Sequence, residues 1–494
     1  MSDTRVPTSA GDATPVSPLR ELLAIAGPTV ATMTSYTLMT FTDKWLVSRL
    51  GPEFVGAQGN GGVAAWVPPS IAVGTLNVIN SFVAQNLGAG RADRGPAYAW
   101  NGLWLSVIYW IVVLLPLAGA LPGIFSSTGM DPQQATWAGE YGRILLLGSL
   151  LNLWTRGLSQ FFYGMHRARV VMTAGIAANI VNLFISAVLV FGNGPVPADL
   201  GLFGRVCGDA GVALGIAPMG IAGSAWGTVI ASGLEFLIPL AVFLGPKMNA
   251  AYHTRRAWRW SMSHVNDIGR VGWPAGLMFG NEMVCWAVFM VYLVSHFGRE
   301  HASAGWIAHQ YMSLSFMPAV GISVACQAVV GKQIGAGRPD LAESRAWLAT
   351  KLAVVYMGIC GVLFVVFRAD LIRLFIEDGT PPDQISELVR LGSMMLIATA
   401  AFQLFDATAM VMSGAPRGAG DTVFAGVATV IASWVIIVGG GFFMIRVFPG
   451  LESLGPWIAA AAYIFALCAL LLGRFLTGKW KRMRLIEPPT TGEA

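Results

Sequence analysis

The sequence has 494 residues, of which 55% are hydrophobic and 12% are charged, and its formal net charge is +5. A soluble domain carries about twice that charged fraction, so the composition excludes an ordinary soluble protein and indicates a chain that lies in a lipid bilayer. The modest positive charge does not indicate nucleic acid as a partner, because the position of the basic residues marks membrane topology instead.

Apolar runs between polar breaks predict twelve transmembrane α-helices. Several runs contain no charged residue and exceed the roughly 20 residues that a helix needs to cross the hydrocarbon, whereas barrel strands would be half as long and alternating. In chain order, the spans are expected near residues 22–50, 62–87, 97–125, 138–164, 169–192, 217–245, 269–297, 303–333, 345–376, 389–414, 420–447 and 453–478. The predicted fold class is therefore an all-α membrane protein.

An internal repeat divides this chain into two lobes. Residues 83–91 read VAQNLGAGR and residues 330–338 read VGKQIGAGR, so the two copies are separated by half of the 494-residue length. Such a repeat in an apolar chain predicts two pseudo-symmetric six-helix lobes, related by an axis along the membrane normal because six spans preserve orientation. We expect the functional site where the lobes meet.

The repeated Gly-Ala-Gly-Arg can be read as an anion cradle or as a tight turn. Neither copy has the Gly-Lys-Ser/Thr ending of a phosphate loop or the third glycine of a dinucleotide fingerprint. We interpret both copies as tight cytoplasmic turns, with Arg91 and Arg338 at the interface. Since no zinc-protease motif, nucleophile elbow or Cys-x-x-Cys pair is present either, we expect neither enzymatic activity, a cofactor nor a structural metal.

The distribution of charge predicts the orientation. Lys and Arg gather in the connections that follow even-numbered spans, whereas the opposite connections carry acidic residues such as Asp131, Asp199, Glu377 and Asp378. Short loops rich in Lys and Arg stay in the cytoplasm. We therefore expect a protein of the bacterial inner (plasma) membrane with both termini on the cytoplasmic side. The expected segments are a disordered cytoplasmic tail at 1–20, an N-lobe at 21–245, a cytoplasmic linker at 246–268, a C-lobe at 269–480 and a second cytoplasmic tail at 481–494.

A few ionisable residues fall inside the predicted spans, namely Asp43, Arg156, Glu235, Glu282 and Asp406. Each charge near the bilayer centre costs about 2.5–3.5 kcal/mol on insertion scales, so such a residue is expected to face the bundle interior, to pair or to line a wet cavity. No Lys or Arg is expected mid-span in the second lobe. Glu282 and Asp406 therefore have no obvious partner in their own lobe, which favours exchange of a proton or cation there.

Two alternatives stay open in the first lobe. For Arg156 and Glu235, a structural ion pair is the simplest explanation. For Asp43, in the outer third of the first span, a local pair with Lys44 or solvation competes with a functional role.

Four segments, taken in order, resemble the multidrug and toxic compound extrusion (MATE) transporters, and the likeness covers about residues 20–480. They are residues 41–51, 218–228, 308–337 and 412–422. The resemblance implies an antiporter that exports organic cations, drugs or related amphipathic compounds in exchange for Na⁺ or H⁺. Alternating access between the two lobes would couple the two fluxes.

The same resemblance implies roles for individual residues. Glu282 and Asp406 look like the acidic pair that forms the cation site of one branch, with Na⁺ as a candidate occupant. Asp43 resembles the aspartate used in proton coupling in the other branch, and Asn182 looks like its polar partner, with Ser186 where a second acid or amide is expected. The candidates for lining the substrate cavity are Phe279, Met283, Phe402, Phe405, Gln310 and Arg156.

Arg156 departs from the family pattern. If it lines the cavity instead of pairing with Glu235, it admits zwitterionic or anionic substrates. The expected partners are cationic or amphipathic small molecules and the lipid bilayer, and we expect a monomer. The alternative function is a lipid-linked glycan flippase of the same superfamily, which needs a cavity rich in Arg for pyrophosphate; a channel or a non-transporting receptor is a different class again.

Overall fold

The computed structural model describes residues 17–376 and 381–486, and this part of the chain is helical without any strand. Residues 1–16 and 487–494 of the two expected tails, and the acidic residues Glu377 and Asp378, lie outside the described residues. Helix α1 begins at Pro18 with Ser17 as its N-cap, so residues 18–20 belong to a helix and not to a disordered tail.

The N-lobe contains six spans. They are α1 (Pro18–Ser48), α2 with α3 (Pro52–Leu76 and Val78–Gly88), α4 with α5 (Gly95–Tyr109 and Leu115–Ser126, joined by a π-helical segment at Trp110–Leu114), α6 (Pro132–Gly164), α7 (Ala168–Phe191) and α9 (Gly220–Phe243). A further helix, α8 (Gly201–Ala213), lies in the connection between α7 and α9.

The C-lobe repeats this pattern. Its spans are α11 (Met262–Val288, continued by a π-helical segment at Phe289–Val294), α12 (Arg299–Gly335), α13 (Pro339–Val366), α15 (Pro382–Ala419), α16 with α17 (Val423–Ala432 and Gly440–Val447, joined by a π-helical segment at Ser433–Gly439) and α18 (Leu454–Leu476). Two short helices, α10 (Pro246–Tyr252) and α14 (Arg368–Arg373), lie in connections.

The expected all-α architecture of twelve spans is confirmed. Within the described residues, eleven helices are long and apolar enough to cross a membrane by length and composition. The remaining span is α6, the fourth in chain order. It is more polar because it carries Glu140, Arg143 and Arg156. A chain with so many apolar helices is an integral membrane protein.

Several boundaries differ from the expected ones. The second span begins at Pro52 and not near residue 62, because the glycines after it continue the helix; a Cβ on Gly61 would lie 2.4 Å from the carbonyl oxygen of Ala138, so glycine allows α2 and α6 to pack closely. The ninth span ends at Val366 and not near 376, since α14 is a separate helix. The linker expected at 246–268 contains α10 and the first turns of α11.

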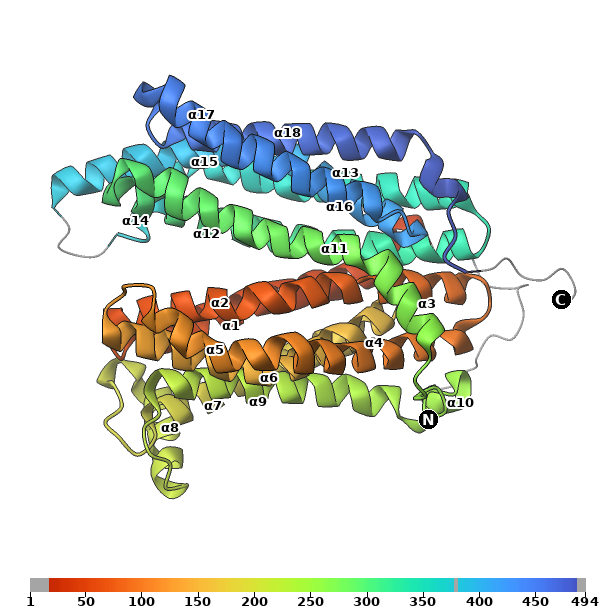
Figure 1. The fold of residues 1–494 in the computed structure, drawn as a ribbon, viewed down its shortest axis with the longest axis horizontal. Helices are drawn as coiled ribbons and strands as arrows, with labels where there is room; N and C mark the ends of the chain where they lie inside the picture. Colours follow the sequence, from red (N-terminus) through yellow and green to blue (C-terminus); the bar gives the residue numbers. More distant parts are fainter. Residues whose placement is uncertain (1–16, 377–380, 487–494) are drawn as a thin grey trace, which may run out of the picture.

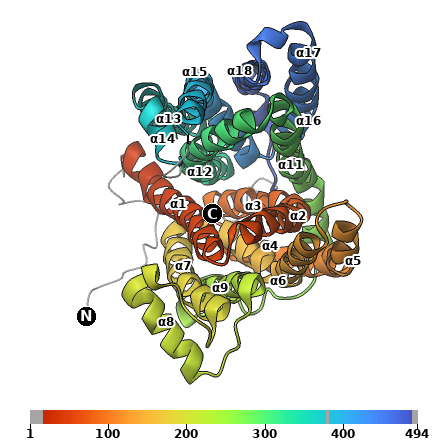
Figure 2. The ribbon, with the colours of Figure 1, turned by 90° about the vertical axis from the view of Figure 1, so that its left-hand side faces the viewer.

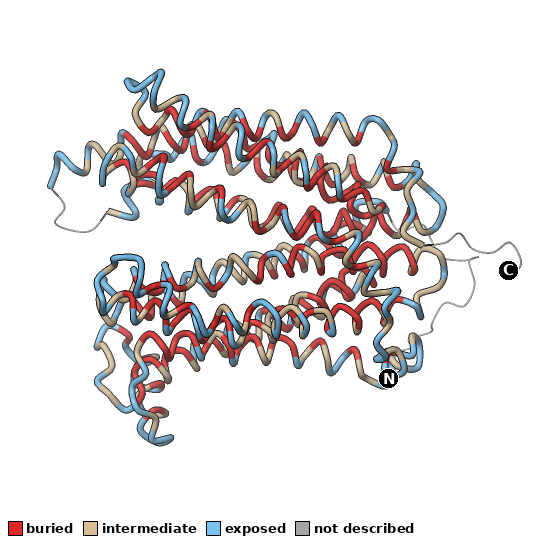
Figure 3. Tube along the Cα trace, in the orientation of Figure 1, coloured by how far each residue is buried: buried red, intermediate tan, exposed pale blue. Residues whose placement is uncertain are grey.

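The lobes form two layers that meet at one end. Figure 1 shows α1–α9 in the lower layer and α11–α18 in the upper layer, with helices that converge on the right and diverge on the left. Figure 2 looks from the divergent end, where α1 and α2 lie next to α12 and α11. Buried residues gather where the helices converge (Figure 3). We call this the convergent end.

The two copies of the repeat build the same turn at the convergent end. Gly90 and Gly337 have φ of 74° and 72°, the left-handed conformation that glycine adopts without strain. Behind them, the backbone N–H of Arg91 donates to Asn86, and that of Arg338 donates to Gln333, each at 2.8 Å. The interpretation of Gly-Ala-Gly-Arg as a tight turn is confirmed.

Glycines from the two repeats also bring the lobes into backbone contact. A Cβ on Gly88 would lie 1.9 Å from the carbonyl oxygen of Lys332, and a Cβ on Gly335 would lie 2.0 Å from that of Gln85. Neither position has room for a side chain, so α3 and α12 cross there with backbone against backbone.

Polar contacts join the lobes around this crossing. Glu21 of α1 pairs with Lys332 and Arg345 of the other lobe, at 3.3 and 3.1 Å. The backbone N–H of Leu485, near the end of the described chain, donates to Gln85 at 2.9 Å. The beginning of α1 and the segment after α18 therefore lie at the same end of the molecule.

Candidate ion and substrate sites

The two acidic residues expected in the C-lobe come from different helices. Glu282 lies in α11 and is half-buried, and Asp406 lies in α15 with 8% of its surface exposed. Two carboxylates in one lobe that are held away from bulk water favour the uptake of a proton or a cation.

Two neutral oxygens of this lobe have unused hydrogen-bonding capacity. Tyr463 of α18 is within electrostatic range of both carboxylates, and its buried hydroxyl has no hydrogen-bond partner among the described residues. The Oε1 of Gln403, one turn before Asp406, is also buried without a partner in the described part of the chain. Among described residues no three His, Cys, Asp or Glu side chains form a metal-binding group, so a cation here would rely on such neutral oxygens.

One arginine of the C-lobe interacts with Glu282 from the end of a span. Arg417 lies in the last turn of α15, beyond the end expected near residue 414, is 8% exposed and interacts electrostatically with Glu282. Its guanidinium donates to Ser413 at 2.8 Å, and among described residues no carboxylate oxygen lies within the 4.0 Å of an ion pair. The helix continues through the Gly-Ala-Pro segment that the sequence presents as a break, so the span ends at Ala419 and not near residue 414.

The N-lobe brings Asp43 and Asn182 together. The amide of Asn182, from α7, donates to Asp43 Oδ1 at 2.7 Å, and the hydroxyl of Thr228, from α9, donates to Asp43 Oδ2 at 3.1 Å. Asp43 is 6% exposed, so neither solvation nor a pair with Lys44 explains it. The hydroxyl of Ser186 donates to Asn182 at 3.3 Å and extends the cluster.

The sequence did not single out the rest of this polar cluster. Thr228 is only the last residue of the family-like segment 218–228. Gln58 lies within hydrogen-bonding distance of both Tyr141 (3.4 Å) and Ser224 (3.5 Å). These side chains come from α2, α6 and α9, which all face the same interior. Spacing offered one usable signal, because Ser224 and Thr228 are one turn apart on α9 and therefore share a face.

Arg156 and Glu235 are neighbours without forming a direct ion pair. The guanidinium carbon of Arg156 lies 4.0 Å from the centre of the Tyr36 ring. The Tyr36 hydroxyl donates to Glu235, and among described residues no carboxylate oxygen lies within 4.0 Å of the Arg156 nitrogens. Tyr36 of α1 thus stands between the two charges, a residue that the sequence interpretation missed although it lies two turns from Asp43 on the same helix.

The remaining cavity candidates lie in different environments. Phe402 is 1% exposed and belongs to the packed core, whereas Phe405 is 45% exposed and packs edge-on against Phe465. Met283 and Gln310 are exposed and Phe279 is half-buried. Packing therefore accounts for Phe402, and a lining role for the other candidates stays a prediction.

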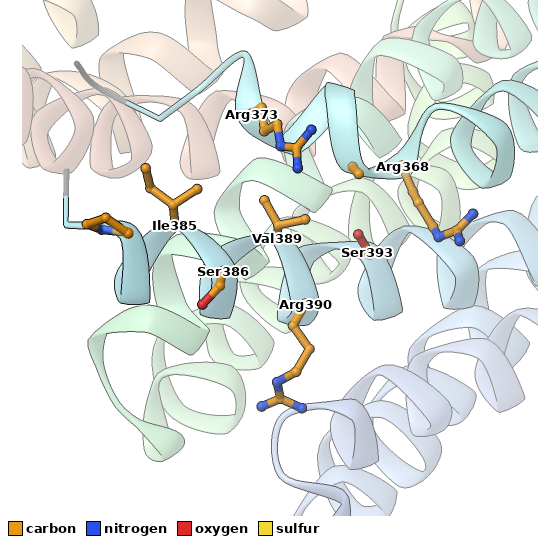
Figure 4. A pocket seen from close by; sticks show the side chains of 9 residues that line it. Arg368, Arg373, Ile385, Ser386, Val389, Arg390 and Ser393 are labelled. Carbon is orange, nitrogen blue, oxygen red and sulfur yellow. The ribbon is translucent and has the colours of Figure 1, made fainter. Parts of the chain in front are cut away.

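A pocket of about 570 Å³ lies away from these residues, between α14 and α15. Figure 4 shows Val389 and Ser393 of α15 facing α14, while Arg390 points to the other side of its helix. There Arg390 pairs with Glu387 at 2.6 Å and with Glu452 at 3.3 Å. Asp43, Arg156, Glu235, Glu282 and Asp406 do not line this pocket.

Two six-helix lobes that share one end, each with a buried carboxylate at the level of the membrane helices, define a two-lobed secondary transporter. The sequence matches the MatE family over residues 28–188 and 275–442. The chain therefore belongs to the MATE family, and it is a transporter and not an enzyme.

Similar proteins agree over nearly the whole length. The chain is 28% identical over 474 residues to a probable multidrug resistance protein NorM from Mesorhizobium japonicum, covering 95% of each chain. Two solved structures share the fold at 20% identity: a MOP superfamily transporter from Pyrococcus furiosus, with a TM-score of 0.81, and a multidrug resistance MATE transporter in an outward-facing conformation, with a TM-score of 0.80. Each comparison covers 94% of this chain and 97% of the other.

Proposed function

We propose that this protein is a cation-coupled antiporter that exports organic cations, drugs or related amphipathic compounds in exchange for Na⁺ or H⁺. Relatives with this length and family are named multidrug resistance proteins, which supports the substrate class. The proposed setting is a bacterial inner membrane with both termini in the cytoplasm, supported by Lys and Arg in the connections at the convergent end.

The observation that carries the proposal is the pair of carboxylates in the C-lobe. Glu282 and Asp406 belong to α11 and α15 of the same lobe, and the buried hydroxyl of Tyr463, which has no hydrogen-bond partner among the described residues, interacts electrostatically with both. Leaving both carboxylates charged and empty is costly in a low-dielectric interior. Binding a proton or Na⁺ removes that cost, and it favours whichever lobe arrangement holds the ion more tightly.

Asp43 is the proposed second coupling residue. It accepts two hydrogen bonds, from Asn182 and Thr228, and these stabilise its charged form without neutralising it. Because its charge has no ion-pair partner among the described residues, it can still take up a proton or a small cation from the divergent end. The flippase alternative gains no support from Arg156, because that guanidinium stacks on Tyr36 beside Glu235 and is a single charge.

The test is ion-driven efflux of a cationic dye from vesicles that contain the full chain. We expect Glu282→Gln and Asp406→Asn each to lower efflux by about 5- to 150-fold, the range of a typical coupling free energy. Glu140→Gln, an exposed carboxylate of α6, is the matched control and should transport like the parent.

Separate gradients then identify the ion. A Na⁺ gradient at equal pH and a pH gradient without Na⁺ are applied to the parent and to Asp43→Asn. Loss of only the pH-driven flux in Asp43→Asn assigns proton coupling to the N-lobe. Undiminished efflux in both C-lobe variants would remove Glu282 and Asp406 from the mechanism.

A further inference from the structure

The mid-membrane cluster of the N-lobe consists of Tyr36, Arg156 and Glu235, from α1, α6 and α9. Glu235 is 5% exposed and accepts a hydrogen bond from the Tyr36 hydroxyl. The guanidinium carbon of Arg156 stands 4.0 Å from the centre of the Tyr36 ring. A buried carboxylate and the face of an aromatic ring are thus presented to one cation.

Arg156 makes few direct polar contacts with the described residues. Its Nε is buried without a hydrogen-bond partner among the described residues, and in the described part of the chain no carboxylate oxygen lies within the 4.0 Å of an ion pair. A structural ion pair that offsets the cost of burial needs close, bidentate geometry. The Tyr36 side chain, through its ring and its hydroxyl, and the longer-range attraction of Glu235 hold the guanidinium here.

The partners of Arg156 match those that an organic cation requires. Aromatic faces attract delocalised and quaternary cations within about 6 Å of the ring centre, and a neighbouring carboxylate supplies the opposite charge. Arg156 and Tyr36 are both partly exposed whereas Glu235 is buried, so the ring is the accessible side of the cluster. The Arg156 side chain therefore occupies the position that a cationic ligand would take between the Tyr36 ring and Glu235.

We propose that Tyr36 and Glu235 form a binding subsite for the cationic group of the substrate, and that the Arg156 guanidinium occupies this subsite when no substrate is bound. The inference rests on the proposed function, since it assumes that organic cations are transported. Substrate binding displaces Arg156, and substrate release lets it return. The transporter therefore never leaves Glu235 without a cation in the membrane interior, which would be costly.

The geometry argues against Arg156 as a receptor for anions. An anion that approaches the guanidinium meets the negative charge of Glu235 and the negative face of the Tyr36 ring. A cation that displaces the guanidinium meets favourable charge on both sides. The cluster also stands in the lobe opposite to Glu282 and Asp406, so substrate and coupling ion need not compete for the same carboxylate.

The test is binding of tetraphenylphosphonium to the purified full-length protein in lipid nanodiscs. If the guanidinium fills the subsite for about nine-tenths of the time, Arg156→Met tightens binding roughly tenfold, because the apparent dissociation constant scales with the fraction of open sites. Tyr36→Leu and Glu235→Gln weaken binding by a similar factor. Arg143→Met, an exposed arginine of the same helix, should bind like the parent.

Three further outcomes are decisive. Weaker or unchanged binding in Arg156→Met, with thermal stability like that of the parent, overturns the inference. The double variant Arg156→Met with Glu235→Gln removes both charges and should bind more weakly than Arg156→Met alone; equal binding overturns the role of Glu235. If benzoate binds the parent and fails to bind Arg156→Met, the residue is an anion receptor instead.

The same experiment separates this inference from the proposed function. A parent protein that neither binds nor exports tetraphenylphosphonium contradicts the proposed substrate class as a whole. A parent that exports it with dependence on Glu282, but whose affinity does not respond to Arg156→Met, contradicts only the subsite.

Discussion

The two lobes are alike at the convergent end and unlike in the middle of the membrane. At the convergent end, Gly88 and Gly335 contact each other's helix in the same way. In the middle, α6 begins at Pro132 and α15 begins at Pro382. At the same distance from these prolines, α6 carries Arg156 and α15 carries Asp406. The duplicated scaffold keeps its backbone contacts and differs where charge decides what is bound.

The likeness between lobes predicts equal and large effects for the paired glycines. Gly88→Ala and Gly335→Ala would each place a Cβ about 2 Å from a carbonyl oxygen of the other lobe. Overpacking of this kind costs about 1–3 kcal/mol, so we expect opening of the convergent end to become about 5- to 150-fold more frequent. Distances between spin labels on the ends of α3 and α12 measure this.

Gly269→Ala is the control for that pair, because a Cβ there meets nothing within 4 Å. It should leave the distances unchanged. A large effect of only one of the two paired substitutions would contradict the symmetry of the contact.

A medium effect is expected from His166, which breaks the likeness of the lobes at the convergent end. Its ring lies 3.4 Å from the carbonyl oxygen of Ala328 in the other lobe, near Lys332 and Glu21. Burial, followed by the charge of Lys332, lowers the pKa of His166 from 6.5 to about 4. The closed arrangement therefore favours the neutral ring, and it loses stability as the pH falls from about 6.5 toward 4.

Between pH 7.5 and 5.5, opening of the convergent end should become about tenfold more frequent in the parent, since a freely exposed histidine takes up a proton over this range. His166→Gln cannot take up that proton and should lose this part of the pH response. The same spin-label distances report it. An unaltered pH response in His166→Gln would place the titrating group elsewhere.

The smallest effect is expected from the ion pairs that cross between the lobes. Glu21→Gln removes the partner of Lys332 and Arg345, and partly exposed pairs contribute about 1 kcal/mol. Opening should become roughly fivefold more frequent, less so at high salt. Glu343→Gln breaks a pair with Lys481 inside the C-lobe and should not change opening; an equal effect of both variants would mean that Glu21 does not act between lobes.

Much of the fold could be predicted because membrane helices leave strong signals. Long apolar runs indicate the spans, and the repeat indicates two lobes and their turn, down to Gly90 and Gly337. The boundaries of the spans were less predictable. Glycines in α2 and the Gly-Ala-Pro segment in α15 look like breaks in the sequence. In a membrane the helix continues through them, because the bilayer core contains no water to satisfy the backbone N–H and C=O groups.

The candidate sites could be predicted only as far as charge reveals them. Asp43, Glu282 and Asp406 stand out because a charge in an apolar run is costly, and the resemblance added Asn182. Tyr36, Thr228 and Tyr463 did not stand out, since neutral polar residues are common in such helices. Their importance arises from which helices meet, and a single sequence does not contain that information.

The reciprocal crossing of Gly88 and Gly335 has the geometry of a homodimer interface. Each half offers a glycine and receives the other's backbone, so the surface is complementary to a copy of itself, as in an assembly with twofold symmetry. The contact therefore does not require the two halves to belong to one chain. A half-length ancestor could have formed it between two separate chains, and fusion then allowed Arg156 and Asp406 to become different residues at one former position.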